Sequence, residues 1–244
     1  MTKNSAKTIS RCLGALVSFD EVLVLDTGST DDTLEIVSTF PTVKVLHQNG
    51  ITNFGKTRNY LAEQASNDWI FMVDSDEICT PELVAEIKTL PDVPATIYGV
   101  LRINHYIDRP IRACAWYPDY NNRIYNRKRT KWKERIVHEI LEIPQTLTCR
   151  RLKGEMNHFS VDGAAPLASK ALWYAELFAK DNAGKRKSSL LKAISHGMWM
   201  FVRCYIFRTG FLYGRDGFTI SFVSAYGSFM KYLLLSEENQ KRDG

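Results

Sequence analysis

The segment FMVDSDE carries three carboxylates within four consecutive residues, directly after an apolar run: Asp74, Asp76 and Glu77. Like charges this close repel one another, so keeping them ionised requires a nearby cation or several hydrogen-bond donors. A divalent ion on a diphosphate meets this need, because Mg²⁺ binds one or two carboxylates while phosphate and water oxygens complete its coordination. The alternative is a solvated acidic turn whose charges interact favourably with the start of the next helix.

The segment VLDTGSTDDT has a second carboxylate, Asp26, at the end of an apolar run. Gly28 and Ser29 follow in a turn that leads into a helical pattern. A tight turn here directs Asp26 into the crevice at the end of the strand, where open α/β sheets bind their ligands. The alternative is a well-capped turn between a strand and a helix, with no ligand.

The elements that position these residues follow a β-α-β-α-β order. Strand-like and helical patterns alternate along residues 21–25, 31–39, 43–46, 57–66 and 69–73. The strands are nearly continuously apolar, which is typical of a parallel sheet with helices on both faces. Since the carboxyl ends of parallel strands meet at one edge of the sheet, Asp26 and Asp74 are expected at the same edge.

Together with NFGKTRN at residues 53–59, these motifs resemble the nucleotide-sugar half of the family 2 glycosyltransferases. The resemblance implies the GT-A fold, which is α/β and Rossmann-like, with a mostly parallel sheet flanked by helices. It implies an inverting hexosyltransferase, and it gives Asp76 to a Mg²⁺ or Mn²⁺ cofactor. It assigns six residues to nucleotide-sugar binding: Asp26, Gly28, Ser29, Arg58, Asp74 and Ser75.

Residues 116–139 and the tail at 203–235 narrow the resemblance. They are similar to the lipopolysaccharide core β-1,4-glucosyltransferases that act on inner-core heptose. This similarity implies UDP-glucose as the donor and a lipopolysaccharide core or lipid-linked acceptor. It also implies a peripheral place on the cytoplasmic face of the inner membrane, and no nucleic acid is expected as a partner.

An inverting transfer needs a base that takes the proton from the acceptor hydroxyl. The candidates are Asp119, Glu134 and Glu139, and the resemblance is firm at the segment VHE, which favours Glu139 over its main rival Asp119. The neighbouring His138 could turn toward the diphosphate or the metal. The alternative is that His138 and Glu139 are an ordinary polar pair at the end of a strand.

A basic run with interleaved aromatic residues occupies the same region. Arginine pairs well with phosphate and carboxylate, and an inner core carries both kinds of anion. Arg123, Arg127 and Trp132 are therefore predicted to bind the acceptor. A solvated loop explains such a charge run equally well.

The chain has 244 residues, of which 45% are hydrophobic, so it can bury one sizeable core. Its net charge of +5 indicates an acidic partner without identifying it. Five scattered cysteines and a polar N-terminus favour the cytoplasm. The expected organisation is a GT-A domain over residues 1–160, with a nucleotide-sugar half at about 1–103 and an acceptor half at about 104–160, followed by a helical region at 161–244.

The C-terminal region combines aromatic residues with single basic ones, such as Arg203, Arg208, Arg215 and Phe222. Basic side chains of such helices could reach anionic headgroups while the aromatic ones enter the membrane interface. A helical bundle that packs on the catalytic core is the alternative.

The N-terminus departs from the family pattern, in which an apolar central strand leads into Thr-x-Asn-Glu. Here Met1 stands at the tail of that strand and Ser5 replaces the glutamate, so the first central strand is expected to be truncated. Its neighbours would then have unpaired backbone groups. Two rival functions remain: a phosphatase of the haloacid dehalogenase type, and a non-catalytic membrane-surface homologue.

Overall fold

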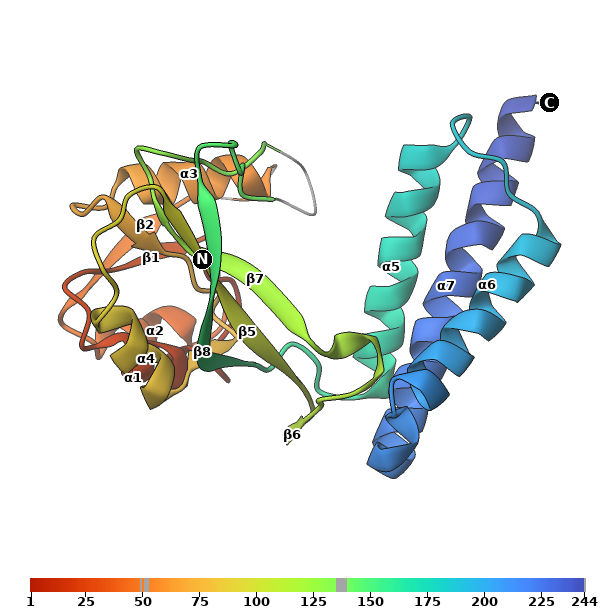
Figure 1. Cartoon of the computed structure of the whole chain (residues 1–244), viewed down its shortest axis with the longest axis horizontal. Coiled ribbons are helices and arrows are strands. Elements are labelled where there is room, and N and C mark those ends of the chain that lie inside the picture. Colours follow the sequence, from red (N-terminus) through yellow and green to blue (C-terminus); the bar gives the residue numbers. More distant parts are fainter. Residues whose placement is uncertain (49, 51–52, 135–139, 244) are drawn as a thin grey trace. The chain divides into compact units, whose positions relative to one another are not determined.

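The computed structural model describes residues 1–48, 50, 53–134 and 140–243 (Figure 1). The chain forms two compact units. The first contains Met1–Arg102 and Asp119–His158, and the second contains Ile103–Pro118 and Phe159–Gly244. The segment Ile103–Pro118, which the sequence analysis assigned to the acceptor half, thus clusters with the C-terminal helices.

Four helices belong to the first unit: α1 (Ile9–Leu16), α2 (Thr33–Ser38), α3 (Phe54–Glu63) and α4 (Pro81–Lys88). Side-chain caps define where two of them begin. The Asn53 side chain accepts a hydrogen bond from the Lys56 backbone nitrogen at 2.9 Å and starts α3. Thr80 caps α4 in the same way, with proline at the first helical position, where its missing N–H costs nothing.

The strands of the first unit form two separate sheets. A two-stranded sheet pairs β1 (Val22–Asp26) with β2 (Val43–His47) in parallel. The larger sheet has the order β3-β7-β5-β8-β4, and its strands are β3 (Trp69–Phe71), β4 (Glu77–Cys79), β5 (Thr96–Tyr106), β7 (Asp119–Asn126) and β8 (Thr148–His158). The pairings β3–β7, β5–β7 and β4–β8 are antiparallel, so among these described pairs the parallel geometry is confined to β1 and β2.

No strand of one sheet pairs with a strand of the other within the described residues. Among the described residues, Thr2 extends the edge of β1 that lies away from β2, through a parallel bridge to Asp26. The Thr2 backbone nitrogen donates to the Leu25 oxygen at 2.9 Å, and the Thr27 nitrogen donates to the Thr2 oxygen at 3.0 Å. Side-chain packing still joins the sheets, since Leu25 of β1 shares an apolar cluster with Ile70 of β3.

The second unit is helical, apart from the end of β5 and its partner β6 (Arg109–Pro110). Its helices are η1 (Cys114–Trp116), α5 (Ala164–Asn182), α6 (Leu190–Val202), η2 (Arg203–Phe207), η3 (Gly210–Tyr213) and α7 (Gly214–Asp243). Both α5 and α6 pack on α7. Small residues allow this close approach: a Cβ at Gly197 of α6 would lie 3.1 Å from that of Phe229.

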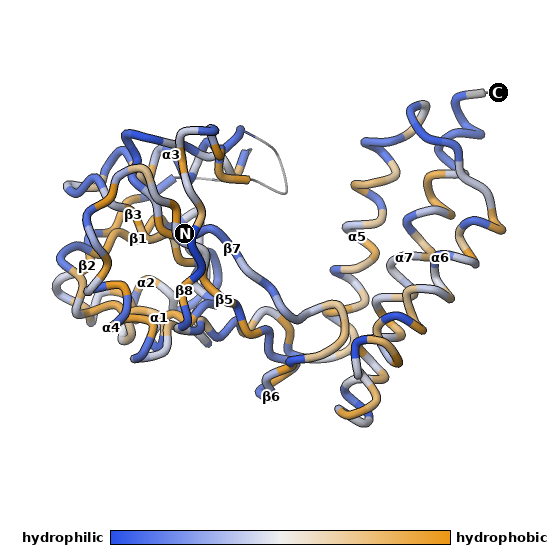
Figure 2. The backbone as a smooth tube through the Cα atoms, viewed as in Figure 1, coloured by the Kyte–Doolittle hydropathy of each residue, from blue (hydrophilic) through white to orange (hydrophobic). Residues whose placement is uncertain are grey.

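One helical stretch in the described part of the chain, Gly210–Arg242, is long and apolar enough by length and composition to cross a membrane. About a fifth of its most apolar window, 22%, is buried inside the protein. Figure 2 shows the hydrophobic residues distributed along α6 and α7.

Candidate functional site

Asp74 follows β3 and is clamped by two buried arginines. The Arg58 Nη2 atom of α3 donates to both carboxylate oxygens, at 3.0 and 3.1 Å, and the Arg123 Nη2 atom of β7 donates to Oδ2 at 3.1 Å. Burial disfavours the ionised carboxylate, but Arg58 and Arg123 outweigh it and hold the pKa of Asp74 well below its usual range. Asp74 is therefore a fixed anion whose orientation is set from two elements.

Glu77, at the start of β4, is fully buried and shares the same arginine. Its Oε1 atom accepts from Arg123 Nη2 and, at 3.3 Å, from Arg102 Nη1 of β5. Its Oε2 atom accepts from the Asp74 backbone nitrogen at 2.9 Å, which closes the acidic turn on itself. Arginines thus supply the positive charge that the crowding of Asp74 and Glu77 requires.

Asp76 lies between these two residues in sequence but has a different environment. Its side chain is 34% exposed, and its Oδ2 atom is 3.3 Å from Nε2 of His158, the last residue of β8. In the described part of the chain, no group of three histidine, cysteine or acidic side chains could hold a metal on its own. One carboxylate beside one imidazole nevertheless fits a divalent ion whose other ligands are diphosphate and water oxygens.

Asp26 ends β1 and organises the turn that follows it. Its carboxylate accepts from the backbone nitrogens of Gly28 at 3.1 Å and of Ser29 at 3.2 Å. Gly28 has a φ of 100°, a conformation that favours glycine. Burial opposes ionisation, but the hydrogen bonds from Ser29 and Gly28 outweigh it, so the pKa of Asp26 is lowered.

The N-terminal residues connect the two strand ends. Thr2 bridges to Asp26, and three residues later the Ser5 hydroxyl lies 2.8 Å from that of Ser75, between Asp74 and Asp76. The carboxyl ends of β1 and β3 therefore face the same short segment. This brings the predicted nucleotide-sugar residues Asp26, Asp74 and Ser75 to one edge of the unit.

The predicted acceptor residues lie in three different environments. Arg123 is buried against Asp74 and Glu77, so its observed contacts are those of a residue that orients the acidic turn. Trp132 is also buried; its indole nitrogen donates to the Tyr125 hydroxyl at 3.0 Å, and the Arg58 guanidinium lies 4.9 Å from its ring centre. Arg127 donates to backbone carbonyls at the end of α3. Their roles in acceptor binding stay predictions.

Two of the three candidate bases, Asp119 and Glu134, lie within the described residues. Glu139 and His138 lie outside the described residues. Glu134 is exposed. Asp119 begins β7, and its Oδ2 atom accepts from Arg102 Nε at 2.8 Å while Oδ1 accepts from the Asn121 amide at 2.9 Å.

Three contributors to this site were not among the residues predicted from the sequence: Glu77, Arg102 and His158. Glu77 belongs to the acidic segment itself, but its burial and its ion pairs depend on residues from β5 and β7. Arg102 and His158 are isolated in sequence from every motif. Only their strand pairing, which brings β4, β5, β7 and β8 together, could have revealed them.

The fold and this edge can be compared with known proteins. The family model described as "Glycosyl transferase family 2" matches residues 1–172, which is more than half of the chain. The chain belongs to glycosyl transferase family 2.

Relatives that match nearly the whole of this chain are also described as glycosyltransferases. An uncharacterised glycosyltransferase of Rickettsia typhi is 26% identical over 261 residues, covering 99% of this chain and 86% of that protein. One of Rickettsia prowazekii is 27% identical over 262 residues, with the same coverage. A solved structure of Staphylococcus aureus TarS, residues 1–349, is 16% identical, with a TM-score of 0.47 over 93% of this chain and 89% of that one.

Family membership decides several predictions. The protein is a glycosyltransferase with the α/β GT-A fold, so it uses a nucleotide-sugar donor and an acceptor. The prediction of an enzyme of this family is confirmed, and the haloacid dehalogenase alternative is wrong.

Proposed function

We propose that this glycosyltransferase moves a hexose, glucose from UDP-glucose, onto a lipopolysaccharide core acceptor with inversion and with the help of Mg²⁺ or Mn²⁺. The observation that carries the proposal is the acidic turn after β3. There Asp74 is fixed by Arg58 and Arg123, while its neighbour Asp76 stays partly exposed beside His158. A rigid anion next to an accessible carboxylate suits one residue that orients the donor and another that holds the metal.

We assign five residues to the binding of the donor and its metal ion. Asp26 and Asp74 are ionised acceptors for hydrogen bonds from the base and the ribose, because both have a lowered pKa. Arg58 donates a hydrogen bond to Asp74, and its guanidinium lies over the Trp132 ring. These contacts hold Arg58 in place to orient Asp74. Asp76 and His158 would hold the divalent ion, which neutralises the diphosphate leaving group when bound.

For the base we favour Glu139 over Asp119. A base must accept a proton from the acceptor hydroxyl, and a carboxylate engaged by an arginine is a weaker proton acceptor. Asp119 is held by Arg102 through Oδ2 and by Asn121 through Oδ1. His138 remains the candidate to contact the diphosphate or the metal.

A lipid-linked acceptor requires a protein that works at a membrane surface. Eleven large apolar side chains between residues 190 and 222 are exposed, and we call them the apolar patch: Leu190, Leu191, Ile194, Met198, Trp199, Ile206, Phe207, Phe211, Leu212, Phe218 and Phe222. Exposed Arg203, Arg208 and Arg215 lie among them in sequence. Such a combination suits peripheral association with anionic lipid on the cytoplasmic face of the inner membrane.

The test is a calorimetric titration of the full chain with UDP-glucose and UDP-galactose, with Mg²⁺ or Mn²⁺ and then with a chelator. We expect metal-dependent affinity for UDP-glucose. Asp76→Asn should lower that affinity about tenfold or more, because a metal ligand is lost. Glu139→Gln should leave donor affinity intact while turnover on a core acceptor falls about a hundredfold or more.

Asp68→Asn is the matched control, because Asp68 precedes β3 at its other end and pairs with Lys128 at the surface. This variant should bind the donor as the unmodified chain does. An absence of metal-dependent affinity for every uridine diphosphate compound would refute the proposal, and so would an unaltered affinity in Asp76→Asn.

A further inference from the structure

Asp119 is disfavoured as the base because Arg102 holds it, yet the same contact ties it to the acidic turn. Its Oδ2 atom accepts from Nε of Arg102 at 2.8 Å and lies 2.8 Å from Nη2 as well. The remaining nitrogen of that guanidinium, Nη1, donates to Glu77 at 3.3 Å. A single arginine therefore spans the distance from the acidic turn to Asp119.

Strand pairing places Arg102, Asp119 and Asn121 on one face of the larger sheet. Arg102 of β5 is directly opposite Asp119 of β7, and Val100 is opposite Asn121. Residues directly opposite each other share a face of a sheet, and so do residues two apart on one strand. The Asn121 side-chain amide donates to Asp119 Oδ1 at 2.9 Å, and we call these two hydrogen-bonded side chains the polar pair.

The polar pair is accessible to a ligand, whereas Glu77 is not. The side chain of Asp119 is 27% exposed, while that of Glu77 has no exposure. Asn121 is also partly exposed. A ligand can therefore contact the polar pair, and the buried Glu77 serves to anchor the arginine behind it.

A carboxylate beside an amide suits the hydroxyl groups of a sugar, which both donate and accept hydrogen bonds. An ionised carboxylate can accept about four hydrogen bonds, so one that holds Arg102 and Asn121 can also accept from a hydroxyl. Hydrogen bonds to an ionised group are roughly twice as strong as those between neutral groups. Because Arg102 already fixes the carboxylate, little side-chain entropy is lost when a sugar binds.

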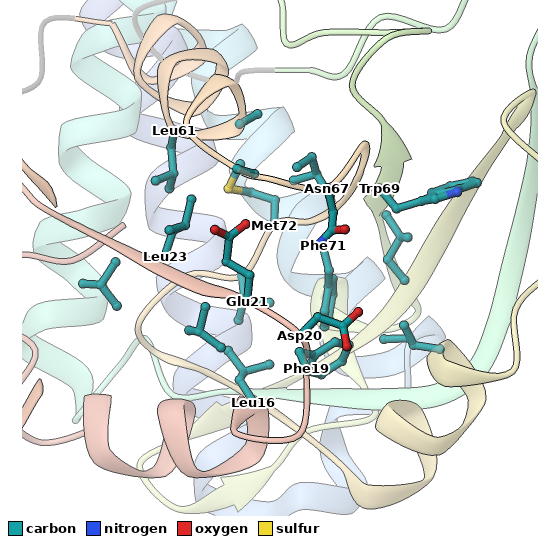
Figure 3. Close-up of a pocket in the computed structure, with 18 of the residues that line it drawn as sticks. Leu16, Phe19, Asp20, Glu21, Leu23, Leu61, Asn67, Trp69, Phe71 and Met72 are labelled. Carbon is teal, nitrogen blue, oxygen red and sulfur yellow. The ribbon is translucent and has the colours of Figure 1, made fainter. Parts of the chain in front are cut away.

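The cavity between β1 and β3 is less suited to a sugar. It has a volume of about 730 Å³, but most of the side chains that line it are apolar, among them Leu16, Leu23 and Leu61 (Figure 3). A sugar is oriented by convergent polar side chains. The polar pair supplies such groups and is joined to the acidic turn.

We propose that the polar pair binds hydroxyl groups of the hexose in the nucleotide-sugar donor, with Asp119 held in place by Arg102. In a nucleotide sugar, one oxygen joins the hexose to the diphosphate. A donor whose diphosphate lies at Asp76 therefore brings its hexose close to the acidic turn, from which the polar pair is separated by one guanidinium. The inference rests on the proposed function, because it requires a donor at that turn.

The experiment compares UDP-glucose with UDP, which carries the same nucleotide without the hexose, in calorimetric titrations of the full chain with Mg²⁺. Asp119→Asn should lower the affinity for UDP-glucose about tenfold, as expected for the loss of a hydrogen bond to a charged group, and leave the affinity for UDP unchanged. Asn121→Ala should lower the affinity for UDP-glucose about threefold and again spare UDP. This second variant removes no charge, so the ion pairs of Arg102 remain.

Asp68→Asn is the matched control, since Asp68 also pairs with an arginine, Arg127, just beyond the other end of β7. It should leave both affinities unchanged. An unaltered affinity for UDP-glucose in Asp119→Asn would overturn the inference, and a loss of turnover alone would then mark Asp119 as the base.

Two further outcomes count against the inference in different ways. Equal losses of affinity for UDP and UDP-glucose in Asp119→Asn would overturn it, because the effect would then concern the nucleotide and not the sugar. If the unmodified chain bound neither compound, the proposed function would fail, and this inference would fail with it.

Discussion

At the scale of single residues, the acidic turn is organised by arginines. Asp74 and Glu77 share Arg123, and each has a further arginine, Arg58 or Arg102. A buried charge is tolerated only when it is paired and hydrogen-bonded, so each of these groups depends on the others. Asp76, by contrast, is partly exposed and lies beside His158, and this is why we propose it as the metal ligand.

Replacing Arg123 with methionine tests this dependence. Arg123→Met leaves Glu77, which has no solvent exposure, without its closest cation, and we expect a loss of about 3–5 kcal/mol in the free energy of unfolding. Arg127→Met, just beyond the end of the same strand, is the matched control, since Arg127 pairs with the partly exposed Asp68 and its loss should cost about 1 kcal/mol or less. Urea denaturation measures both. Similar losses in the two variants would contradict the assigned network.

At the scale of elements, the sequence predicts the helices and strands that are defined by a pattern of neighbouring residues. The apolar runs at β1, β2 and β3 and the helical patterns at α2 and α3 lie within or next to the elements they predict. The helix α1 was missed, although its buried residues Ile9, Cys12, Leu13 and Leu16 have helical spacing.

The strand β8 and the site contacts could not be predicted in this way. The sequence of β8, TCRRLKGEMNH, is mostly polar, and its place in the sheet depends on partners far away in the chain. The same is true of the contact between Asp74 and Arg123, which are 49 residues apart. Motifs predicted that Asp74 and Arg58 belong to a site, but not that they bind each other.

The packing of α4 on β8 provides a prediction at this scale. A Cβ at Gly154 of β8 would lie 2.7 Å from the backbone nitrogen of Leu83, which is fully buried in α4. Gly154→Ala must therefore displace the helix, and we expect a loss of about 1–3 kcal/mol in stability.

Gly14→Ala in α1 is the control, since a Cβ there meets nothing within 4 Å. It should increase stability by up to about 1 kcal/mol through helix propensity. Thermal unfolding followed by circular dichroism compares the two variants. Equal Tm values would show that the helix yields to the added methyl group without cost.

At the scale of the whole molecule, the two units have different surfaces. The first unit buries a charged network at the edge that carries Asp26 and Asp74, whereas the second leaves the apolar patch in contact with solvent. Isolated exposed apolar residues are normal, but eleven within 33 positions of sequence indicate an interaction surface. Composition alone predicted aromatic helices; which side chains are exposed required the packing of α5 and α6 on α7.

The apolar patch gives the last prediction. Serine at three of its four most exposed positions, Leu191, Phe207 and Leu212, should lower binding to phosphatidylethanolamine–phosphatidylglycerol vesicles about tenfold or more, because each side chain contributes about 1.5–3 kcal/mol when it leaves water. Added salt should weaken the binding of the unmodified chain as it screens the neighbouring arginines. Vesicle sedimentation measures both effects.

The matched control replaces exposed apolar residues of the first unit, Val17, Val93 and Ile143, with serine. These side chains are dispersed along the chain, so their loss should leave sedimentation unchanged. If the control and the patch variant lost vesicle binding equally, exposed apolar residues in general, and not the apolar patch, would account for the binding. Unchanged binding in the patch variant would remove the membrane from the proposed function. The calorimetric titration with UDP-sugars would then be the test of the donor site at Asp74 and Asp76.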